Sequence, residues 1–401
     1  MILPKILYKI SKELTLHNAT AIIVGGAIRD HFLKKRIKDY DIEVYGLESI
    51  EELEDILKPF GAVNVVGRSF GVLKFVYNKE EYDFSFPRVE NKVSKGHRGF
   101  EVICDGNLDF KEASRRRDFT INSMGYNIQS GVLLDPFNGR GDIQKRILRA
   151  VDGKSFIEDP LRVYRAIQFS ARFNYTLSND TEILCKNMVK DALLDELAEE
   201  RVYQEWVKLL LKSDKPSIGF NLMKRLGVLR YFPELEELNS TLWSFTMSYI
   251  DRVVEYKTDN SRTNLTLLFA TLSINIEKKK RSTLLYRLTN NHKLIASIVN
   301  LVEYYHIPNQ LYKSRADDSE IRILSTKVNI SLLTKLVESD IENIKSAQWL
   351  YRNAKRLNVE ERAPKPIIEG RDLIGVGLEP SPQFKDILNE LYMLQLRGEI
   401  I

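Results

Sequence analysis

Cysteine is scarce in this sequence, and long hydrophobic runs are absent. The 401 residues include two cysteines, Cys104 and Cys185, which lie far apart and form no CxxC pair. This pattern argues against a disulfide framework and against a zinc site. No apolar stretch approaches the length of a transmembrane helix, and no signal-peptide cleavage site follows the N-terminal helix pattern. We therefore expect a protein of the reducing cytoplasm with no membrane partner.

The charge is close to balanced. Sixty basic residues against 55 acidic residues leave a formal net charge of +5, with a pI near 8.8. This excess permits a polyanionic partner without requiring one. The hydrophobic content of 43% and the charged content of 29% are those of an ordinary globular protein. A chain of 401 residues exceeds a single small core, so two to four modules are expected.

The stretch from residue 20 to 46 carries the strongest functional signal. A short apolar run at 21–24 leads directly into Gly25 and Gly26, and a helix-like segment with Arg29 follows. A strand, a tight turn and a helix start in this order can hold a phosphate group on free backbone N–H groups. A Gly-Gly pair by itself is most often only a turn.

A second strand pattern at 39–45 carries two aspartates. Asp39 and Asp41 alternate with Tyr40 and Ile42, so the two carboxylates are expected on one face, about 7 Å apart. Two carboxylates so close are costly to keep ionised unless a cation lies between them. Mg²⁺ suits such a site because it binds through one or two carboxylates together with substrate phosphates. The plain alternative is a solvated pair; with the Gly-Gly turn, the pattern favours a nucleotide-binding site.

The order and spacing of these parts are specific. The pattern GGxxRD, eight residues and DxD resembles the signature of the polymerase-β superfamily of nucleotidyltransferases, and within it that of class II tRNA nucleotidyltransferases (CCA-adding enzymes) and bacterial poly(A) polymerases. The resemblance implies an α+β fold. It implies a nucleotidyltransferase sheet domain at 1–145, a helical neck that selects the nucleobase at 146–215, a helical body at 216–340 and a tRNA-binding tail at 341–401.

The superfamily also needs a third carboxylate from a neighbouring strand. Asp83 is the one charge in the strand pattern at 82–86. A lone aspartate at a strand edge is usually solvated, but the resemblance places Asp83 in the third position. Its implied role is to complete the metal site or to help deprotonate the attacking 3′-hydroxyl.

Three consecutive arginines precede the next strand pattern, which is expected at 121–128. RRDFTIN at 116–122 resembles the second motif of the family, although an arginine run can also be a solvated face. Arg117 can pair with phosphate oxygens, and Asp118 can accept a hydrogen bond from a ribose hydroxyl. The resemblance therefore implies that this motif binds the sugar and the phosphates.

The segment EDPLRVYRAIQFSARF at 158–173 reads as a helix entry and resembles the templating motif of the family. Asp159, Arg162 and Arg165 fall three apart, hence along one side of the expected helix, and the first two would read the Watson-Crick edge of the incoming base. A modest surface salt bridge is the alternative. Gln168 departs from the pattern, because many relatives carry an arginine there.

Beyond residue 215 the chain reads as helices joined by polar turns. Several members of the family carry an HD phosphohydrolase module here, which needs metal-binding His and Asp. None of the five histidines of this chain is followed by Asp. We therefore expect an HD-like helical bundle without that metal chemistry, followed by a tail whose GRDL run resembles the HD-containing branch of CCA-adding enzymes.

The resemblance implies a template-independent enzyme that rebuilds the 3′-terminal CCA of tRNA from CTP and ATP. Asp39 and Asp41 would hold Mg²⁺, and the Gly25-Gly26 turn with Arg29 would cradle the phosphates. An enzyme that adds only C or only A remains open, although a basic loop expected at 87–99 argues against C alone.

Two rivals are less favoured. A poly(A) polymerase usually follows its second strand with more arginines than the run at 65–71 contains. A non-catalytic RNA-binding protein has no need of a carboxylate cluster near a polyanion.

Overall fold

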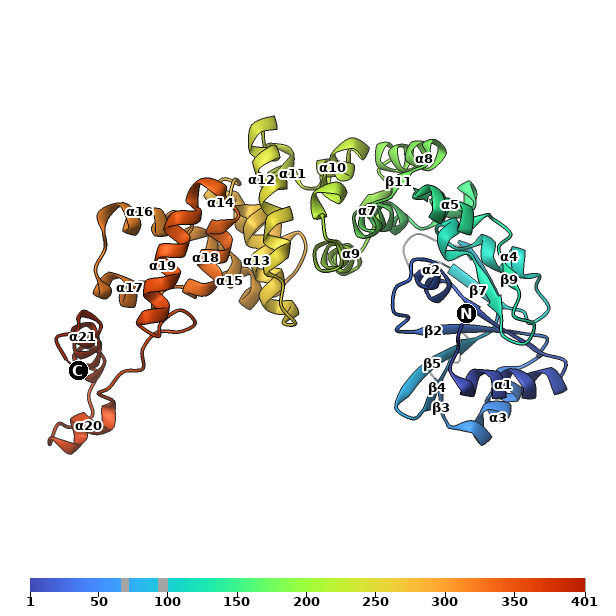
Figure 1. Cartoon of the computed structure of the whole chain (residues 1–401), viewed down its shortest axis with the longest axis horizontal. Coiled ribbons are helices and arrows are strands. Elements are labelled where there is room, and N and C mark those ends of the chain that lie inside the picture. Colours follow the sequence, from blue (N-terminus) through green and yellow to red (C-terminus); the bar gives the residue numbers. More distant parts are fainter. Residues whose placement is uncertain (66–71, 93–99, 401) are drawn as a thin grey trace. The chain divides into compact units, whose positions relative to one another are not determined.

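The computed structural model describes residues 1–65, 72–92 and 100–400. The chain forms two compact units, the first made of Met1–Trp206 with Leu222–Val228 and the second of Val207–Asn221 with Leu229–Ile401. Figure 1 shows a sheet domain in blue and cyan at the start of the chain and helices after it. The predicted α+β fold is thereby confirmed, while the predicted division into four modules stays a prediction.

The first unit is built on a mixed sheet. Its described strands are β1 (Thr20–Val24), β2 (Tyr40–Tyr45), β3 (Ala62–Val65), β4 (Val72–Tyr77), β5 (Glu80–Ser85), β8 (Gly125–Asn127) and β9 (Leu133–Leu134). They follow the order β3-β4-β5-β2-β1-β8-β9. The pair β2 and β5 is parallel, and the other described neighbours are antiparallel. The strand that carries Asp41 therefore lies in the middle of the sheet.

Side-chain alternation on β2 gives the sheet two different faces. Ile42 and Val44 are fully buried on the face that helices cover. The helices α1 (Lys5–Leu16) and α3 (Ile50–Leu57) contact each other and the strands β1, β3 and β4, and Figure 1 shows them together beside the sheet. Asp41 and Glu43 consequently belong to the opposite face.

The strand expected at 121–128 is largely replaced by other structure. A 3₁₀ turn, η3 (Thr120–Asn122), precedes the short strand β8. The Ser123 hydroxyl donates to the carbonyl of Thr120 at 2.8 Å, and the Asn122 amide donates to Asp118 at 2.9 Å. These local bonds compete with strand pairing, so the prediction of a strand is wrong for this part.

The polar loop expected at 87–99 contains a strand. β6 (Arg88–Lys92) pairs antiparallel with β7 (Phe100–Cys104). Residues 93–99 of the expected loop lie outside the described residues, as do residues 66–71 of the run that was used to weigh a poly(A) polymerase. The argument against a poly(A) polymerase from the run at 65–71 therefore rests on the sequence alone.

The remaining elements of the first unit are mostly helices. They are α2 (Gly26–Phe32), α4 (Phe110–Arg115), α5 (Gly139–Lys145), α6 (Gly153–Glu158), α7 (Leu161–Phe173), α8 (Asn179–Lys190) and the start of α9 (Glu199–Lys212). A two-residue parallel pair, β10 (Ile147–Leu148) with β11 (Thr176–Leu177), joins them. The sequence predicted no strand beyond residue 145, and pairs this short carry no periodicity that could reveal them.

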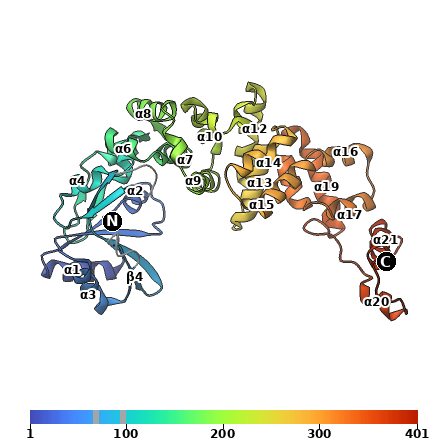
Figure 2. The ribbon, with the colours of Figure 1, turned by 180° about the vertical axis from the view of Figure 1, so that it is seen from behind.

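The second unit is helical throughout its described residues. Its main helices are α12 (Ser240–Val253), α13 (Ser261–Ser273), α15 (His292–Glu303), α16 (Ile307–Ser314), α17 (Asp318–Ser325), α18 (Ile330–Glu338), α19 (Ile344–Arg356) and α21 (Phe384–Arg397). α13 contacts α12, α15 and α18 and is buried on nearly all sides, and Figures 1 and 2 show it within the bundle. No helix in the described ranges is both long enough and apolar enough to cross a bilayer.

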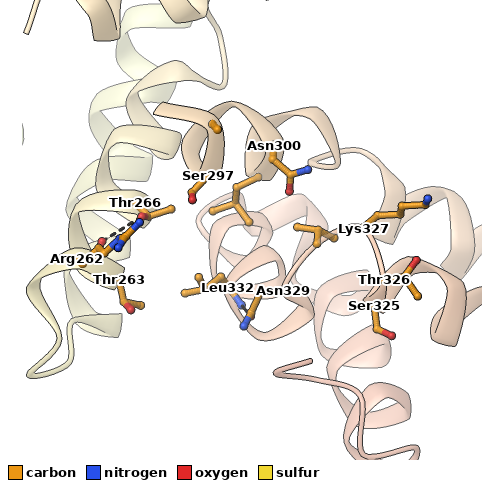
Figure 3. Close-up of a pocket in the computed structure, with 13 residues that line it drawn as sticks. Arg262, Thr263, Thr266, Ser297, Asn300, Ser325, Thr326, Lys327, Asn329 and Leu332 are labelled. Carbon is orange, nitrogen blue, oxygen red and sulfur yellow. Dashed lines mark hydrogen bonds between the residues drawn. The ribbon is translucent and has the colours of Figure 1, made fainter. Parts of the chain in front are cut away.

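A hollow of about 600 Å³ opens between α13, α15 and the turn from α17 to α18. Arg262 and Lys327 lie at opposite ends of it, and hydroxyl and amide side chains occupy the space between them (Figure 3). Within the described residues, its lining contains no His, Asp or Glu. The described lining of this hollow therefore offers hydroxyl, amide and cationic groups but no carboxylate or imidazole.

Candidate nucleotide-binding site

A second cavity, of about 410 Å³, lies entirely within the first unit. Its described lining consists of Gly25, Gly26, Arg29, Asp41, Arg88, Arg116, Arg117, Asp118, Asn122, Asp159, Arg162 and Arg165. All eight predicted nucleotide-binding residues are present, together with Asp41. Six arginines face three aspartates, so the wall carries a positive excess that suits a polyphosphate.

The Gly-Gly turn makes room for arginine side chains. Gly25 has a φ of +71°, a backbone conformation that glycine adopts without strain. A Cβ atom at Gly25 would lie 2.9 Å from Nη1 of Arg117, and one at Gly26 would lie 3.3 Å from Nη2 of Arg29. The two glycines therefore allow both guanidinium groups to approach the backbone where α2 begins.

Arg29 is fixed at the cavity wall by contacts on several sides. Its Nη1 donates to Oδ1 of Asn122 at 2.6 Å, and its Nε donates to Asp30 at 2.8 Å. The guanidinium lies over the rings of Phe173 and Phe169, at 4.9 and 5.6 Å from their centroids. The side chain is buried, so little freedom remains to be lost when a ligand binds.

Asp118 and Arg165 form a buried ion pair in the cavity wall. Oδ2 of Asp118 accepts from Nε of Arg165 at 2.7 Å, while Oδ1 accepts from the Phe119 amide at 2.7 Å and from Asn122 at 2.9 Å. Burial raises the pKa of Asp118, but attraction to Arg165 and the bond from Asn122 outweigh it, so the pKa is lowered. The carboxylate is thus held ionised by the protein, and its proposed bond to a ribose hydroxyl stays a prediction.

The predicted base-reading pair is arranged differently from a helical i,i+3 pair. Asp159 lies before α7 in an extended backbone conformation, because it ends α6 and precedes Pro160. It accepts from the Leu161 amide at 3.2 Å and pairs with Arg201 at 3.3 Å. The expectation that it shares one helix side with the two arginines is therefore wrong.

Arg162 is held in the cavity wall by hydrogen bonds to two other segments. Its Nη1 donates to the carbonyl of Ser155 at 2.7 Å and to the Ser155 hydroxyl at 3.2 Å, and its Nη2 donates to the carbonyl of Arg116. Gln168, the departure from the family motif, is buried on α7 and is not part of the described cavity lining. The departure from the family motif at Gln168 therefore concerns a position outside the described lining.

The carboxylates on the sheet are neighbours but are not identically placed. Asp41 on β2 lies directly beside Asp83 on β5 in the strand register. Asp39 precedes β2 and lines a different hollow, together with Arg36 and Lys38. Within the described residues, no three acidic, His or Cys side chains are already arranged around one metal position. The catalytic and metal-binding roles of the three aspartates remain predictions.

The electrostatics of Asp41 nevertheless fit a divalent cation. Although the side chain keeps an accessible surface, surrounding protein displaces water from it, and this is the largest cause of a raised pKa. Arg117 acts in the opposite direction, and the negative charges of Asp83, Asp39 and Glu43 raise the pKa further. Such crowding of negative charge is what a bound divalent cation relieves.

Glu43 is the functional candidate that sequence reasoning missed. It is buried on β2 and accepts hydrogen bonds from Arg116 at 3.0 Å and from Arg117 at 2.9 Å. The available signal was alternation, because Asp39, Asp41 and Glu43 occupy every second position of the strand pattern. Arg88, Arg116 and Asn122 were also left without a role, although they line the cavity.

Comparison with known proteins places these features in a family. Residues 21–149 match the family described as "Poly A polymerase head domain", and residues 174–238 match "Probable RNA and SrmB- binding site of polymerase A". The multifunctional CCA protein of Laribacter hongkongensis is 38% identical over 217 residues, which are 54% of this chain and 51% of that protein. The chain thus spans about half the length of this and similar curated relatives.

Longer matches extend the similarity. The CCA-adding enzyme of Blochmanniella floridana is 33% identical over 309 residues, covering 73% of this chain and 71% of that protein. A solved CCA-adding enzyme with CTP shares the fold at a TM-score of 0.75 and 23% identity, covering 100% of this chain and 93% of the other. The Thermotoga maritima CCA-adding enzyme complexed with tRNA gives 0.71 and 20%, with coverage of 100% and 93%. The predicted resemblance is confirmed: the chain belongs to the family of CCA-adding enzymes and poly(A) polymerases.

Proposed function

We propose that this protein is a template-independent tRNA nucleotidyltransferase that builds or repairs the 3′-terminal CCA from CTP and ATP. The observation that carries the proposal is the 410 Å³ cavity, where phosphate-binding arginines, a metal carboxylate and a polar base-reading pair meet. Relatives named multifunctional CCA protein and CCA-adding enzyme, and solved CCA-adding enzymes with CTP, ATP or tRNA, support the same reaction.

The triphosphate is bound by the arginine wall. Arg29 and Arg117 approach the Gly25-Gly26 turn, and Arg116 lies beside Arg117 on the same buried carboxylate. Guanidinium groups bind phosphate oxygens with two parallel donors, and prior anchoring reduces the entropy lost on binding. These side chains orient the α-phosphate toward the aspartates of the sheet.

Asp41 with Asp39 and Asp83 would hold the divalent cation, which we propose to be Mg²⁺. When bound, the cation supplies activation of the RNA 3′-hydroxyl and charge neutralisation of the departing pyrophosphate. Asp83 also helps to deprotonate the RNA 3′-hydroxyl, because it lies beside Asp41 in the strand register. These roles would place the chemistry at the edge of the arginine wall.

The base is selected by Asp159 and Arg162. Arg162 offers hydrogen-bond donors and Asp159 offers acceptors, which complements the acceptors and the exocyclic amine of cytosine. Arg201 pairs with Asp159, and the Ser155 carbonyl accepts from Arg162, so both side chains are held in the cavity wall. A small rotation of the same pair would serve the edge of adenine, which needs both a donor and an acceptor.

The test uses tRNAs that lack three, two or one of their 3′-terminal nucleotides. Each is incubated with Mg²⁺ and with CTP, ATP or both, and product length is read on a gel. We expect completion to CCA and then arrest. Addition of only C or only A identifies a partial enzyme, long A tails identify a poly(A) polymerase, and no addition to any tRNA overturns the proposal.

A further inference from the structure

A fully buried glutamate lies under the arginine wall. The side chain of Glu43 is 2% exposed, although it carries a carboxylate that is costly to bury without partners. It lies on β2 two residues beyond Asp41, so both side chains leave the same face of the sheet. A group that binds Glu43 is therefore held on the same strand as Asp41, a proposed metal ligand.

The partners of Glu43 occupy both of its oxygens. Oε1 accepts from Nη2 of Arg116 at 3.0 Å and from Nη2 of Arg117 at 2.9 Å. Oε2 accepts from the hydroxyl of Tyr45 at 2.9 Å. Tyr45 is on the same strand face and therefore fixes the rotation of the carboxylate, which in turn fixes where the two guanidinium groups can lie.

The two arginines connect Glu43 to two other parts of the cavity wall. Arg117 reaches the Gly25 turn, where a Cβ atom would lie 2.9 Å from its Nη1. The backbone carbonyl of Arg116 accepts from Arg162, the arginine of the base-reading pair. One buried carboxylate thus anchors side chains that face the phosphates and a backbone group that holds the base reader.

We propose that Glu43 is a positioning residue that sets Arg116 and Arg117 in the orientation needed to bind the triphosphate of CTP or ATP. This inference rests on the proposed function. Glu43 does not belong to the described cavity lining and acts through the two arginines, because its own oxygens are occupied by them and by Tyr45.

Two substitutions separate the position of this carboxylate from its charge. Glu43→Asp keeps the charge and moves the carboxylate back by one methylene group. Glu43→Gln keeps the length, since its amide oxygen can still accept from both arginines while its NH₂ donates to Tyr45. If Glu43 positions the arginines, the aspartate variant is the more harmful; if it only balances charge, the glutamine variant is.

The measurement is the KM for CTP, with kcat, and the inhibition constant of inorganic tripolyphosphate. We expect Glu43→Asp to raise KM and the inhibition constant about tenfold or more, since small misplacements of binding groups have large effects. For Glu43→Gln we expect less than about threefold. Both constants are independent of the active fraction, so partial unfolding alone would not change them.

Glu112 provides the matched control. It lies on α4 of the same unit, pairs with Arg115 at 2.9 Å and is 52% exposed, outside the described cavity lining. The corresponding Asp and Gln variants should leave KM unchanged. If Glu43→Asp does not fold in a thermal melt, Tyr45→Phe tests the same geometry by freeing Oε2, with an expected rise of roughly two- to fivefold.

The outcomes distinguish the inference from the proposed function. Unchanged constants in Glu43→Asp, or a larger effect in Glu43→Gln, overturn the positioning role while nucleotide addition by the wild type stands. If the wild type adds no nucleotide, binding of tripolyphosphate by calorimetry still compares the variants. An unchanged affinity in Glu43→Asp, or in Tyr45→Phe where the first variant is unfolded, then overturns the inference.

Discussion

Two polar hollows of this protein, one from each unit, differ in how their polar groups are held. The larger hollow, about 600 Å³, lies in the helical unit and has its cations at opposite ends of the view in Figure 3. The smaller cavity, about 410 Å³, gathers six arginines, three of which donate to the buried side chains of Glu43 and Asn122. The volume of a hollow is therefore a poor guide to function. Charged side chains that line one cavity and are held by buried hydrogen-bond partners indicate a preorganised ligand site.

The largest expected effect comes from removing a carboxylate of the smaller cavity. If Asp41 is a metal ligand, as proposed, Asp41→Ala should lower nucleotide incorporation by roughly 10³-fold or more, because loss of metal coordination removes several kcal/mol of transition-state stabilisation. Affinity for tRNA, measured by filter binding, should change by no more than a few fold. Asp55→Ala, an exposed change on α3, is the control, and near-normal incorporation by Asp41→Ala in Mg²⁺ would refute the assignment.

The motifs of this cavity could be predicted from sequence because each is a short local pattern. GGxxRD, DxD, RRD and the templating segment together contain ten of the described lining residues, and each motif can be recognised from neighbouring letters of the sequence. The register of β2 and β5 then places Asp83 beside Asp41, as the family resemblance implied.

The features of the cavity that the sequence does not predict depend on contacts between distant segments or on local backbone geometry. The bonds from Arg116 and Arg117 to Glu43 join residues 73 and 74 positions apart, which no periodicity encodes. The spacing of Asp159 and Arg162 predicts that both lie on one helix, but the chain is extended at Asp159, directly before Pro160. Long-range pairing and local backbone geometry are the two features that single-sequence patterns do not contain.

A second substitution tests whether the ion pair of Asp118 with Arg165 also stabilises the fold. Asp118→Asn removes the charge that faces Arg165 and should lower the free energy of unfolding by about 3 kcal/mol, the lower end for breaking a buried pair, because Arg165 keeps 31% exposure. The measurement is urea unfolding at neutral pH. Asp191→Asn, at the exposed end of α8, should have almost no effect, and equal stabilities of the two variants would contradict the buried pair.

The same pair predicts how stability depends on pH. The folded protein lowers the pKa of Asp118 below its unfolded value, so this carboxylate binds fewer protons in the folded state. The contribution of this carboxylate to folding stability is fully present above its pKa in the unfolded chain, about 4. This contribution is lost as the pH falls through the folded pKa. The free energy of unfolding, measured at a series of pH values downward from pH 5, should therefore fall less steeply for Asp118→Asn than for the wild type.

A smaller effect is expected at Asp159 and Arg162, the proposed base-reading pair. Arg162→Ala should reduce discrimination between CTP and UTP by about 1–3 kcal/mol, the range for a good bidentate base contact, while incorporation persists. The readout is the ratio of kcat/KM for CTP over UTP on a tRNA without CCA. Arg172→Ala, on the same helix but outside the described cavity lining, is the matched control. An unchanged ratio in Arg162→Ala would leave a structural bond to Ser155 as its role.

The smallest expected effect concerns the hollow of the helical unit. Metal-dependent hydrolysis of a phosphodiester needs His and carboxylate ligands that converge on the reacting phosphate. The described lining there consists of hydroxyl, amide, apolar and two cationic side chains, and no histidine of the sequence is followed by Asp. Pure protein should therefore release no product from 2′,3′-cyclic nucleotides with added Mg²⁺, Mn²⁺ or Ni²⁺. Hydrolysis that survives Asp41→Ala would place a second reaction centre in this chain and reverse the comparison between the two hollows.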